Sequence, residues 1–408
     1  MYIWPKEIQQ IIAEVLHAQN PITCLEKFKN YEPAKKITFL LFDGNQTTNF
    51  QYITHDYNLS KYRIVNLGNY ANTAIITTSM LLDKNDLTAI KTAYSVNIDS
   101  NIVSMLPQLL KNKPITPDFL NFLVYIKKNN LDLNISPYLL EDSLNSSGMK
   151  NEARAYECLL SFFSFSDLSL QQLYSLPISP DVIAFNHADD AWSQMKYSRF
   201  YERNDEKRVH SIYCFLLKVY IIEFGSKKSS RKKLIELVDF INTNLGIYLE
   251  SGLLLAYWYF NKSYNCVLDF FQKIQPGAKD KLKKVEGMAW DLFHLWDIPT
   301  EMAVQSHTYN AIILQAFATH DDALAQIAKL NPIVRIAFYQ QEAQVKYKLS
   351  LSNFLHNDPI IDSIIDNQKQ RECLCETVDL IELSTQLEHE FLNREYPKVC
   401  VNLQTDVR

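Results

Sequence analysis

Residues 151–290 carry a nearly continuous helical pattern, and this stretch most constrains what the chain can fold into. Segments such as RVHSIYCFLLKVYIIEF and RKKLIELVDFINTNLGIYL repeat apolar residues at intervals of three and four, as amphipathic helices do. Breaks fall at Ser179-Pro180, at Gly225 and at Pro276-Gly277. We therefore expect a mainly helical protein in which this stretch does not supply the central sheet.

Strand-like segments lie on both sides of this helical stretch. The residues before position 91 begin with an amphipathic helix and continue with segments rich in Thr, Ile and aromatic residues, at 36–43, 50–57 and 73–82. Residues 93–103 contain a short buried strand that ends at Asp99, and residues 309–330 read as a buried strand, an acidic turn and a helix. The sequence therefore predicts an α/β fold that is mainly helical.

The same patterns divide the chain into three parts. Residues 1–90 form a small α+β segment of unknown role. Residues 91–335 form a core with a large helical insertion at about 150–285, and residues 336–408 form a helical C-terminal extension. Within the core, residues 117–130 are amphipathic, and Ser136-Pro137 is a helix-start signal.

Glycine content and charge exclude several classes of function. The chain has 8 glycines in 408 residues, and neither a GxGxxG nor a GxxxxGK[ST] motif occurs, which argues against dinucleotide binding and P-loop nucleotide hydrolysis. The net charge of −5 is unlike that of proteins that coat nucleic acid. Any nucleic-acid contact must therefore use a local basic surface, for which residues 227–233 and 279–284 are the candidates.

Cysteine usage and hydropathy bear on the compartment. Seven cysteines at irregular spacing indicate free thiols in a reducing environment, and the single Cys-x-Cys at residues 373–375 is a weak metal signal. The N-terminal residues lack the layout of a signal peptide. The most apolar run, near 251–260, is much shorter than the ~20 residues of a membrane span. We expect a cytoplasmic protein that does not enter a membrane.

Two segments share an unusual layout of strand, acid and helix. In one, the apolar run SVNI is followed by Asp99; in the other, AIILQAFATH is followed by Asp321 and Asp322. Acids at the carboxyl ends of neighbouring parallel strands lie where α/β sheets place ligands and catalytic groups. Hard cations such as Mg²⁺ and Mn²⁺ prefer oxygen ligands of this kind.

These residues resemble the acidic motifs of the PIN-like domain metal-dependent nuclease family. The family has an Asp at the end of its first strand with an Asn soon after it, which is similar to Asp-Ser-Asn at residues 99–101. It has a Glu on an early helix, like Glu141, and later acids like Asp291 and like the Thr-His-Asp turn at residues 319–321. The resemblance covers about residues 93–335.

The resemblance implies a fold, an activity and a site. The fold would be a parallel sheet sandwiched by helices, with the helical stretch as an insertion. The activity would be metal-dependent phosphodiester hydrolysis, with single-stranded RNA as the substrate and Mg²⁺ or Mn²⁺ as the cofactor. The metal-binding and catalytic residues would be Asp99, Glu141, Asp291 and Asp321. The sequence does not decide whether the chain assembles into a homo-oligomer.

The sequence leaves rivals for several of these positions. The interval from Glu141 to Asp291 is much longer than a compact PIN-like domain needs, so another acid could take the third position. Asp189, Asp190 and Asp297 are rivals for the position of Asp291. Asp142 is a rival for Glu141, and Asp322 could also replace one of the four acids.

Each acid also fits an ordinary structural role. Asp99 and Asp321 precede helices that they could cap, and Glu141 lies near the start of a helix, where its charge is favourable. The alternative function is accordingly a catalytically inactive helical scaffold protein with a degenerate PIN-like core. Whether Asp99, Glu141 and Asp321 converge in the structure is the observation that bears on this choice.

Overall fold

The chain divides into two units, and the boundary between them crosses one long helix, α13 (Lys281–Tyr309). The computed structural model describes residues 4–43, 57–82, 90–111, 114–144, 152–197, 205–356 and 358–393. Unit 1 comprises residues 1–206 and 291–349, and unit 2 comprises residues 207–290 and 350–408. The strands predicted before residue 90 therefore belong to the same unit as Asp99 and Asp321.

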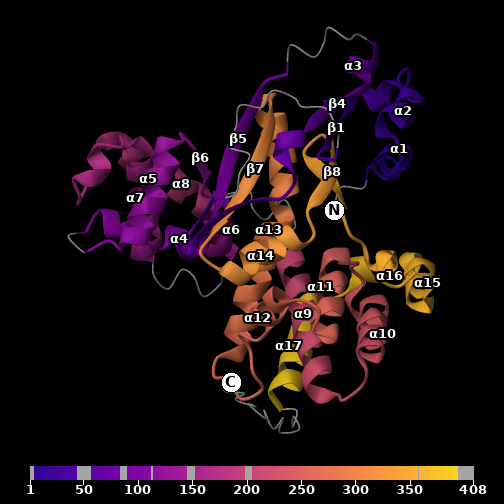
Figure 1. Ribbon diagram of the computed structural model, residues 1–408. Helices are drawn as coiled ribbons and strands as arrows, with labels where there is room; N and C mark the ends of the chain where they lie inside the picture. Colours follow the sequence, from indigo (N-terminus) through magenta and orange to yellow (C-terminus); the bar gives the residue numbers. More distant parts are fainter. Residues whose placement is uncertain are drawn as a thin grey trace, which may run out of the picture. The chain divides into compact units, whose positions relative to one another are not determined.

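The larger sheet of unit 1 is built around two parallel strands, β5 (Thr92–Ile98) and β7 (Ile312–Thr319) (Figure 1). The two strands that end at Asp99 and before Asp321, which the sequence suggests are neighbours, are thus paired in parallel. All eight residues of β7 are buried, as expected of a central strand. The sheet as a whole is mixed, because β6 is parallel to β5 whereas β3 is antiparallel to β7 and β2 to β3. The mainly helical α/β class is confirmed. The outer strands are β6 (Asp132–Asn134), β3 (Tyr62–Asn66) and β2 (Tyr57–Leu59).

A crossover connection carries the chain from β5 to the parallel strand β6. It begins with the short helix α4 (Ser100–Val103) and a 3-10 turn (Leu106–Leu109), and continues with α5 (Pro117–Lys128). Thr116 caps α5 by accepting a hydrogen bond from the backbone N–H of Phe119, and Pro117 occupies the first helical position. The chain then enters α6 (Ser136–Leu144), as the Ser-Pro signal predicts.

The second sheet of unit 1 has four antiparallel strands in the order β4-β1-β8-β9. Residues 36–43 supply β1 as predicted, whereas residues 73–82 split into β4 and the short helix α3. Of the predicted strand at 50–57, only Tyr57 lies within the described residues. The elements are β1 (Ile37–Leu41), β4 (Ala74–Ile76), α3 (Thr78–Leu82), β8 (Ile333–Tyr339) and β9 (Glu342–Tyr347).

The expectation of helix from residue 336 onward is wrong as far as residue 347. Residues 333–347 form the hairpin β8–β9, and Gln340 at its turn has a positive φ of 57°. The strand β9, EAQVKY, does alternate polar and apolar residues, so its pattern favours a strand, and the expectation of helix overlooked this signal. Helices do follow further along, from residue 359 to residue 393.

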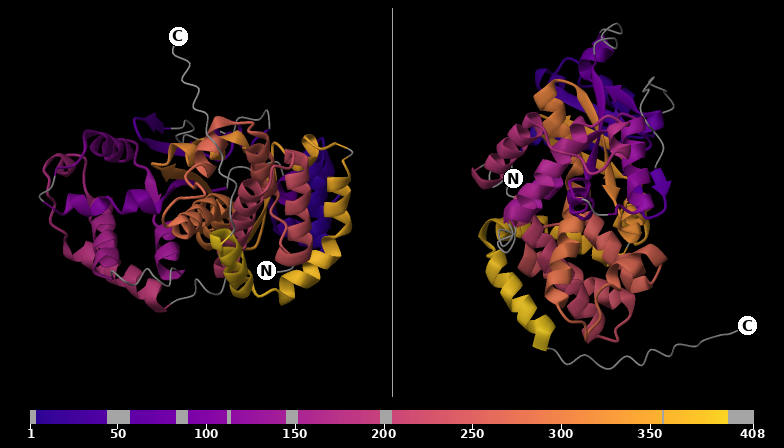
Figure 2. Two further views of the ribbon diagram at one scale, coloured as in Figure 1. Left: turned by 90° about the horizontal axis from the view of Figure 1, so that it is seen from below. Right: turned by 90° about the vertical axis from the view of Figure 1, so that its left-hand side faces the viewer.

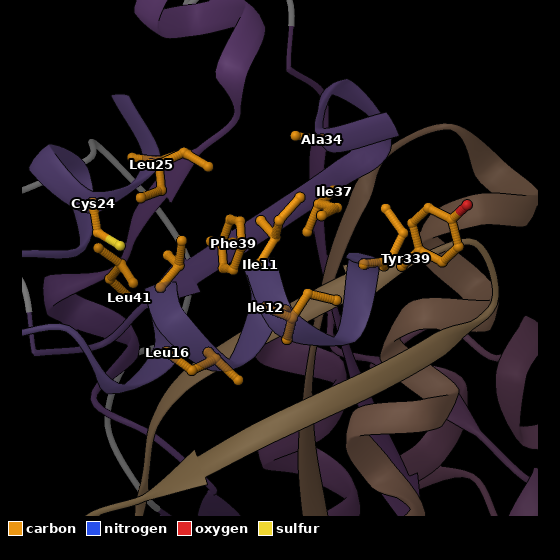
Figure 3. Close-up of a cluster of buried hydrophobic side chains, with 14 of the residues drawn as sticks. Ile11, Ile12, Leu16, Cys24, Leu25, Ala34, Ile37, Phe39, Leu41 and Tyr339 are labelled. Atoms are coloured by element: carbon orange, nitrogen blue, oxygen red, sulfur yellow. The ribbon is translucent and has the colours of Figure 1, made fainter. Parts of the chain in front are cut away.

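Two N-terminal helices, α1 (Lys6–His17) and α2 (Pro21–Glu26), pack on the β1–β8 sheet. In α1 the buried residues recur at intervals of three and four, which places them on one face of the helix. Figure 3 shows Ile11, Ile12 and Leu16 of this face gathered with Phe39 of β1. The amphipathic helix predicted at the N-terminus is therefore present, and it forms part of the core of unit 1.

The described residues between 152 and 285 form helices and no strand, in keeping with their periodicity. The unit boundary cuts this stretch at Glu206, so its first part belongs to unit 1 and its second part to unit 2. Figure 2 shows the helices of the whole stretch from two further directions. Within the described residues no helix is both long and apolar enough to cross a membrane. The helices are α7 (Glu152–Asp167), α8 (Val182–Tyr197), α9 (Asp205–Gly225), α10 (Ser230–Phe240), α11 (Glu250–Asn261) and α12 (Asn265–Phe271), and unit 2 adds α15 (Pro359–Asp366), α16 (Gln368–Thr377) and α17 (Leu380–Asn393).

Arg335 ties three elements of unit 1 together from a buried position on β8. Its guanidinium donates hydrogen bonds to the carbonyls of Leu16 (2.8 Å) and Ala18 (2.6 Å), at the end of α1. It also forms a 2.9 Å ion pair with Asp43, just beyond β1. Because helix ends leave carbonyl groups without intrahelical partners, the guanidinium satisfies groups that would otherwise be buried unpaired.

We predict that Arg335→Leu lowers the free energy of unfolding of unit 1 by about 2–4 kcal/mol, because it leaves buried carbonyls and a carboxylate unpaired. Arg335→Lys should lower it less, since lysine keeps the charge but not the forked geometry. Urea denaturation followed by hydrogen exchange of α1 and β8 measures both effects. Equal stability of the leucine variant and the wild type would contradict the assignment.

Candidate functional site

Asp99 lies directly after β5, and its carboxylate points toward β7. The residue is buried, with an exposed fraction of 3%. Its Oδ2 accepts hydrogen bonds from Thr319 Oγ1 and from Asn101 Nδ2, each at 2.6 Å. The side chain makes no capping hydrogen bond to α4, although the residue has the backbone geometry of an N-cap. Ordinary helix capping therefore does not account for this carboxylate.

Several charges act on the buried carboxyl of Asp99. Burial raises its pKa above the usual range, and the charges of Glu141 and Asp321 raise it further. The hydrogen bond from Thr319 and the positive charge of His294 act in the opposite direction. The structure thus brings three of the four predicted acids into electrostatic reach of one another. A cation in this region would favour the charged form of Asp99.

Glu141, on α6, is held by two partners. Its Oε2 accepts a hydrogen bond from Ser100 Oγ and lies 3.4 Å from His294 Nε2. Burial acts to raise the pKa of Glu141, but the hydrogen bond and charge of His294 and the hydrogen bond from Ser100 outweigh it. The pKa of Glu141 consequently lies below its ordinary value, and the carboxylate is the favoured form.

Asp321 and Asp322 differ in their surroundings. Asp321 caps α14 (Asp322–Leu330) by accepting a 3.1 Å hydrogen bond from the backbone N–H of Leu324, and its own N–H donates to Thr319 Oγ1. Asp322 is exposed and forms a 2.8 Å ion pair with Arg63 of β3. Asp321 therefore combines a structural role with a place near Asp99, whereas the rival Asp322 is paired with β3.

One α13 side chain that reaches the acidic group is His294. It is buried and contacts Glu141, whereas the predicted Asp291 lies one turn earlier on the same helix and is half-buried. Asp297, its rival, lies one turn later and is buried. Residues three apart share one side of a helix, so this spacing in the sequence could have pointed to His294. His294 is not among the candidate residues named from the sequence.

The remaining rivals lie on α6 and α8. Asp142 follows Glu141, and burial together with the charge of Glu141 raises its pKa to about 6. Asp189 accepts a 2.7 Å hydrogen bond from the hydroxyl of Tyr156, and Asp190 is exposed on the same helix. Asp189 thus has a structural partner between helices α7 and α8.

A band of buried amides crosses the sheet beneath Asp99, and sequence reasoning missed it. Asn97 Nδ2 donates to Gln315 Oε1 at 2.8 Å, and Asn134 Nδ2 donates to Asn97 Oδ1 at 2.6 Å. These bonds join side chains of β6, β5 and β7 and support their register. The signal was the polar alternation Ser95, Asn97, Asp99 in a strand otherwise buried on both faces.

The donor chemistry of this group suits a hard divalent cation. Its acidic donors are carboxylate oxygens, and Asn101 Oδ1 beside Asp99 is buried and accepts no hydrogen bond. Among the described residues, however, no three His, Cys, Asp or Glu side chains are arranged as a ready metal site. Binding an ion would require the carboxylates to move closer together.

Comparisons of the chain with protein-family models, curated proteins and solved structures found no match. The resemblance to PIN-like nucleases therefore rests on the residues themselves.

We predict that Asp99→Asn raises the melting temperature slightly in EDTA at pH 7, corresponding to roughly 1 kcal/mol. Asn removes a buried charge but still offers an oxygen to Thr319 and Asn101. Because the folded-state pKa of Asp99 is raised, the cost of its ionisation is absent at low pH and appears as pH rises through that pKa. Thermal melts should therefore show that the stability gained by Asp99→Asn over the wild type shrinks toward acidic pH. A variant less stable than the wild type at pH 7 would contradict this account.

Proposed function

We propose that this chain is a metal-dependent phosphodiesterase related to the PIN-like nucleases and that it cleaves single-stranded RNA in the cytoplasm. The observation that carries the proposal is the buried carboxyl of Asp99 at the carboxyl end of β5, on which the charges of Glu141 and Asp321 act. Parallel strands direct their carboxyl ends to one edge of the sheet, where ligands commonly bind. Burying a carboxylate beside two others is unfavourable unless a cation offsets it, which supports a binding role over a purely structural one.

Asp99, Glu141 and Asp321 would hold Mg²⁺ or Mn²⁺, with Asp291 as the fourth acid of the family pattern. The ion, when bound, supplies a water of lowered pKa and neutralises charge that develops on the phosphate. The chain itself orients the carboxylates. Thr319 and Asn101 hold Asp99, and Ser100 with His294 holds Glu141 in its charged form.

Residues next to the acids would contact the substrate. His320, between Thr319 and Asp321, is exposed, and its ring lies 6.0 Å from that of Tyr62, centroid to centroid. Its imidazole can donate a hydrogen bond to a phosphate oxygen. The basic segments at 227–233 and 279–284 belong to unit 2, and we assign them no contact with a substrate at this site.

An apolar surface on unit 1 favours the second candidate, a helical scaffold protein. Tyr174, Val182, Ile183 and Phe185 are exposed near the start of α8, with exposed fractions from 42% to 73%. Exposed apolar patches often mark protein–protein contacts. A scaffold would use this surface and would need no divalent ion at the acidic group.

We predict that the purified chain cleaves single-stranded RNA with Mn²⁺ or Mg²⁺, and that EDTA abolishes the cleavage. Asp99→Asn and Asp321→Asn should each reduce kcat at least about a hundredfold, because each removes a charge that holds the ion. Asn can still cap α14, so the fold should persist in Asp321→Asn. Cleavage of a labelled oligoribonucleotide provides the measurement.

The matched control is Asp190→Asn, an equal change of charge at an exposed position of the same unit. This variant should retain full activity. Equal activity of the wild type, Asp99→Asn and Asp321→Asn would rule out the proposed site. Absence of metal-dependent cleavage together with absence of divalent-ion binding would favour the scaffold.

A further inference from the structure

A polar pocket of about 350 Å³ lies in unit 1, away from the acidic group. It is bounded by the start of β7, the end of α13 and the two strands β1 and β8 of the second sheet. A volume of this size lies at the lower end of the range for small-molecule sites, roughly 300–1,000 Å³. Every described residue of its lining belongs to unit 1, so the pocket is formed within one unit.

The lining of this pocket is basic and rich in hydroxyl groups. Lys36, Lys91 and His307 contribute nitrogen donors, and Thr77 and Ser79 add hydroxyls. Among the described lining residues there is no aspartate or glutamate. In a chain of net charge −5, a pocket whose described lining holds cations and no carboxylate is suited to an anion.

The basic pocket and the acidic group lie at opposite ends of the same two strands. Lys91 precedes β5 and Asp99 follows it; Ile312 begins β7 and Asp321 lies just beyond its end. A seven-residue strand is ~20 Å long, so the two sites are separate. One ligand of the size of the pocket cannot reach both.

Neutralisation of the end of α13 is a structural explanation for these cations. A helix C-terminus carries roughly half a negative charge, and basic residues stabilise it. Lys36 and Lys91 together carry two positive charges, about four times the size of that half charge. The terminal turn is also partly satisfied within the chain, because the backbone N–H of Ala311 donates to the carbonyl of Ser306 at 3.2 Å. The helix end therefore needs only part of the positive charge of the pocket. Lys36, Lys91 and His307 are exposed, so water solvates the rest until an anion binds.

We propose that this pocket binds a small molecule carrying a phosphate monoester. Lys36 and Lys91 contact the phosphate, and His307 and the hydroxyls of Thr77 and Ser79 donate hydrogen bonds to its oxygens. Met80 and Phe338, which also line the pocket, offer an apolar wall for the rest of the molecule. This binding uses no residue of the acidic group and needs no divalent ion.

Isothermal titration of the full chain in EDTA tests the proposal, with inorganic phosphate, AMP and adenosine as probes. AMP should bind, and adenosine should bind at least about tenfold more weakly, because charge-assisted hydrogen bonds to the phosphate are lost. Phosphate should compete with AMP. Absence of AMP binding at millimolar concentration, or equal binding of adenosine, would overturn the proposal.

A pair of double variants assigns the binding to this pocket. Lys36→Gln with Lys91→Gln should weaken AMP binding at least about tenfold. Lys29→Gln with Lys61→Gln removes the same charge from exposed positions elsewhere in unit 1 and should leave the affinity unchanged. Melting curves verify that both proteins are folded. Equal weakening in the two double variants would show a general charge effect and would overturn the assignment.

Discussion

The burial of the Asp99 carboxylate between β5 and β7 is the constraint on which the rest of the site depends. A charge at this depth is unfavourable, and the chain supplies hydrogen bonds from Thr319 and Asn101 to the same oxygen. The bond from Thr319 requires that β5 and β7 be adjacent and in register, as the parallel ladder from Thr92 to Ile98 places them, whereas the bond from Asn101 is local. The hydrogen-bonded amides of Asn97, Gln315 and Asn134 support the same register, two residues before Asp99 in β5.

Much of this arrangement could be predicted from the sequence because it is local. Apolar runs followed by an acid and then a helix gave β5 with Asp99 and β7 with Asp321, and the Ser-Pro signal gave α6 with Glu141. In each case the residues that set the structure lie within a few positions of one another. The parallel pairing followed from the shared layout of the two segments.

The rest of the site depends on contacts between residues far apart in the chain. His294 meets Glu141 across 153 positions, and Asn97 meets Gln315 across 218. No periodicity within one segment indicates such pairs. The hairpin of β8 and β9 is a different case, because a local signal was present. The residues of β9, EAQVKY, alternate polar and apolar, and this period of two predicts a strand. The pairing of β9 with β8, and of β8 with β1, completes the sheet.

Polarity differs between the two ends of the central strands. The carboxyl ends of β5 and β7 carry acids suited to a cation, and their amino ends border a pocket suited to an anion. The same two strands fix both sets of residues, which allows each to be held by a rigid element. Rigid elements hold chemical groups more firmly than loops do.

The proposed site requires that Asp99, Glu141 and Asp321 bind one divalent cation. Anomalous scattering from crystals grown or soaked with Mn²⁺ measures this binding. We expect an anomalous peak with carboxylate oxygens of these three residues at about 2.0–2.6 Å from it, the range for hard cations with oxygen ligands. Absence of a peak between β5, α6 and β7 in crystals that bind Mn²⁺ elsewhere would contradict it.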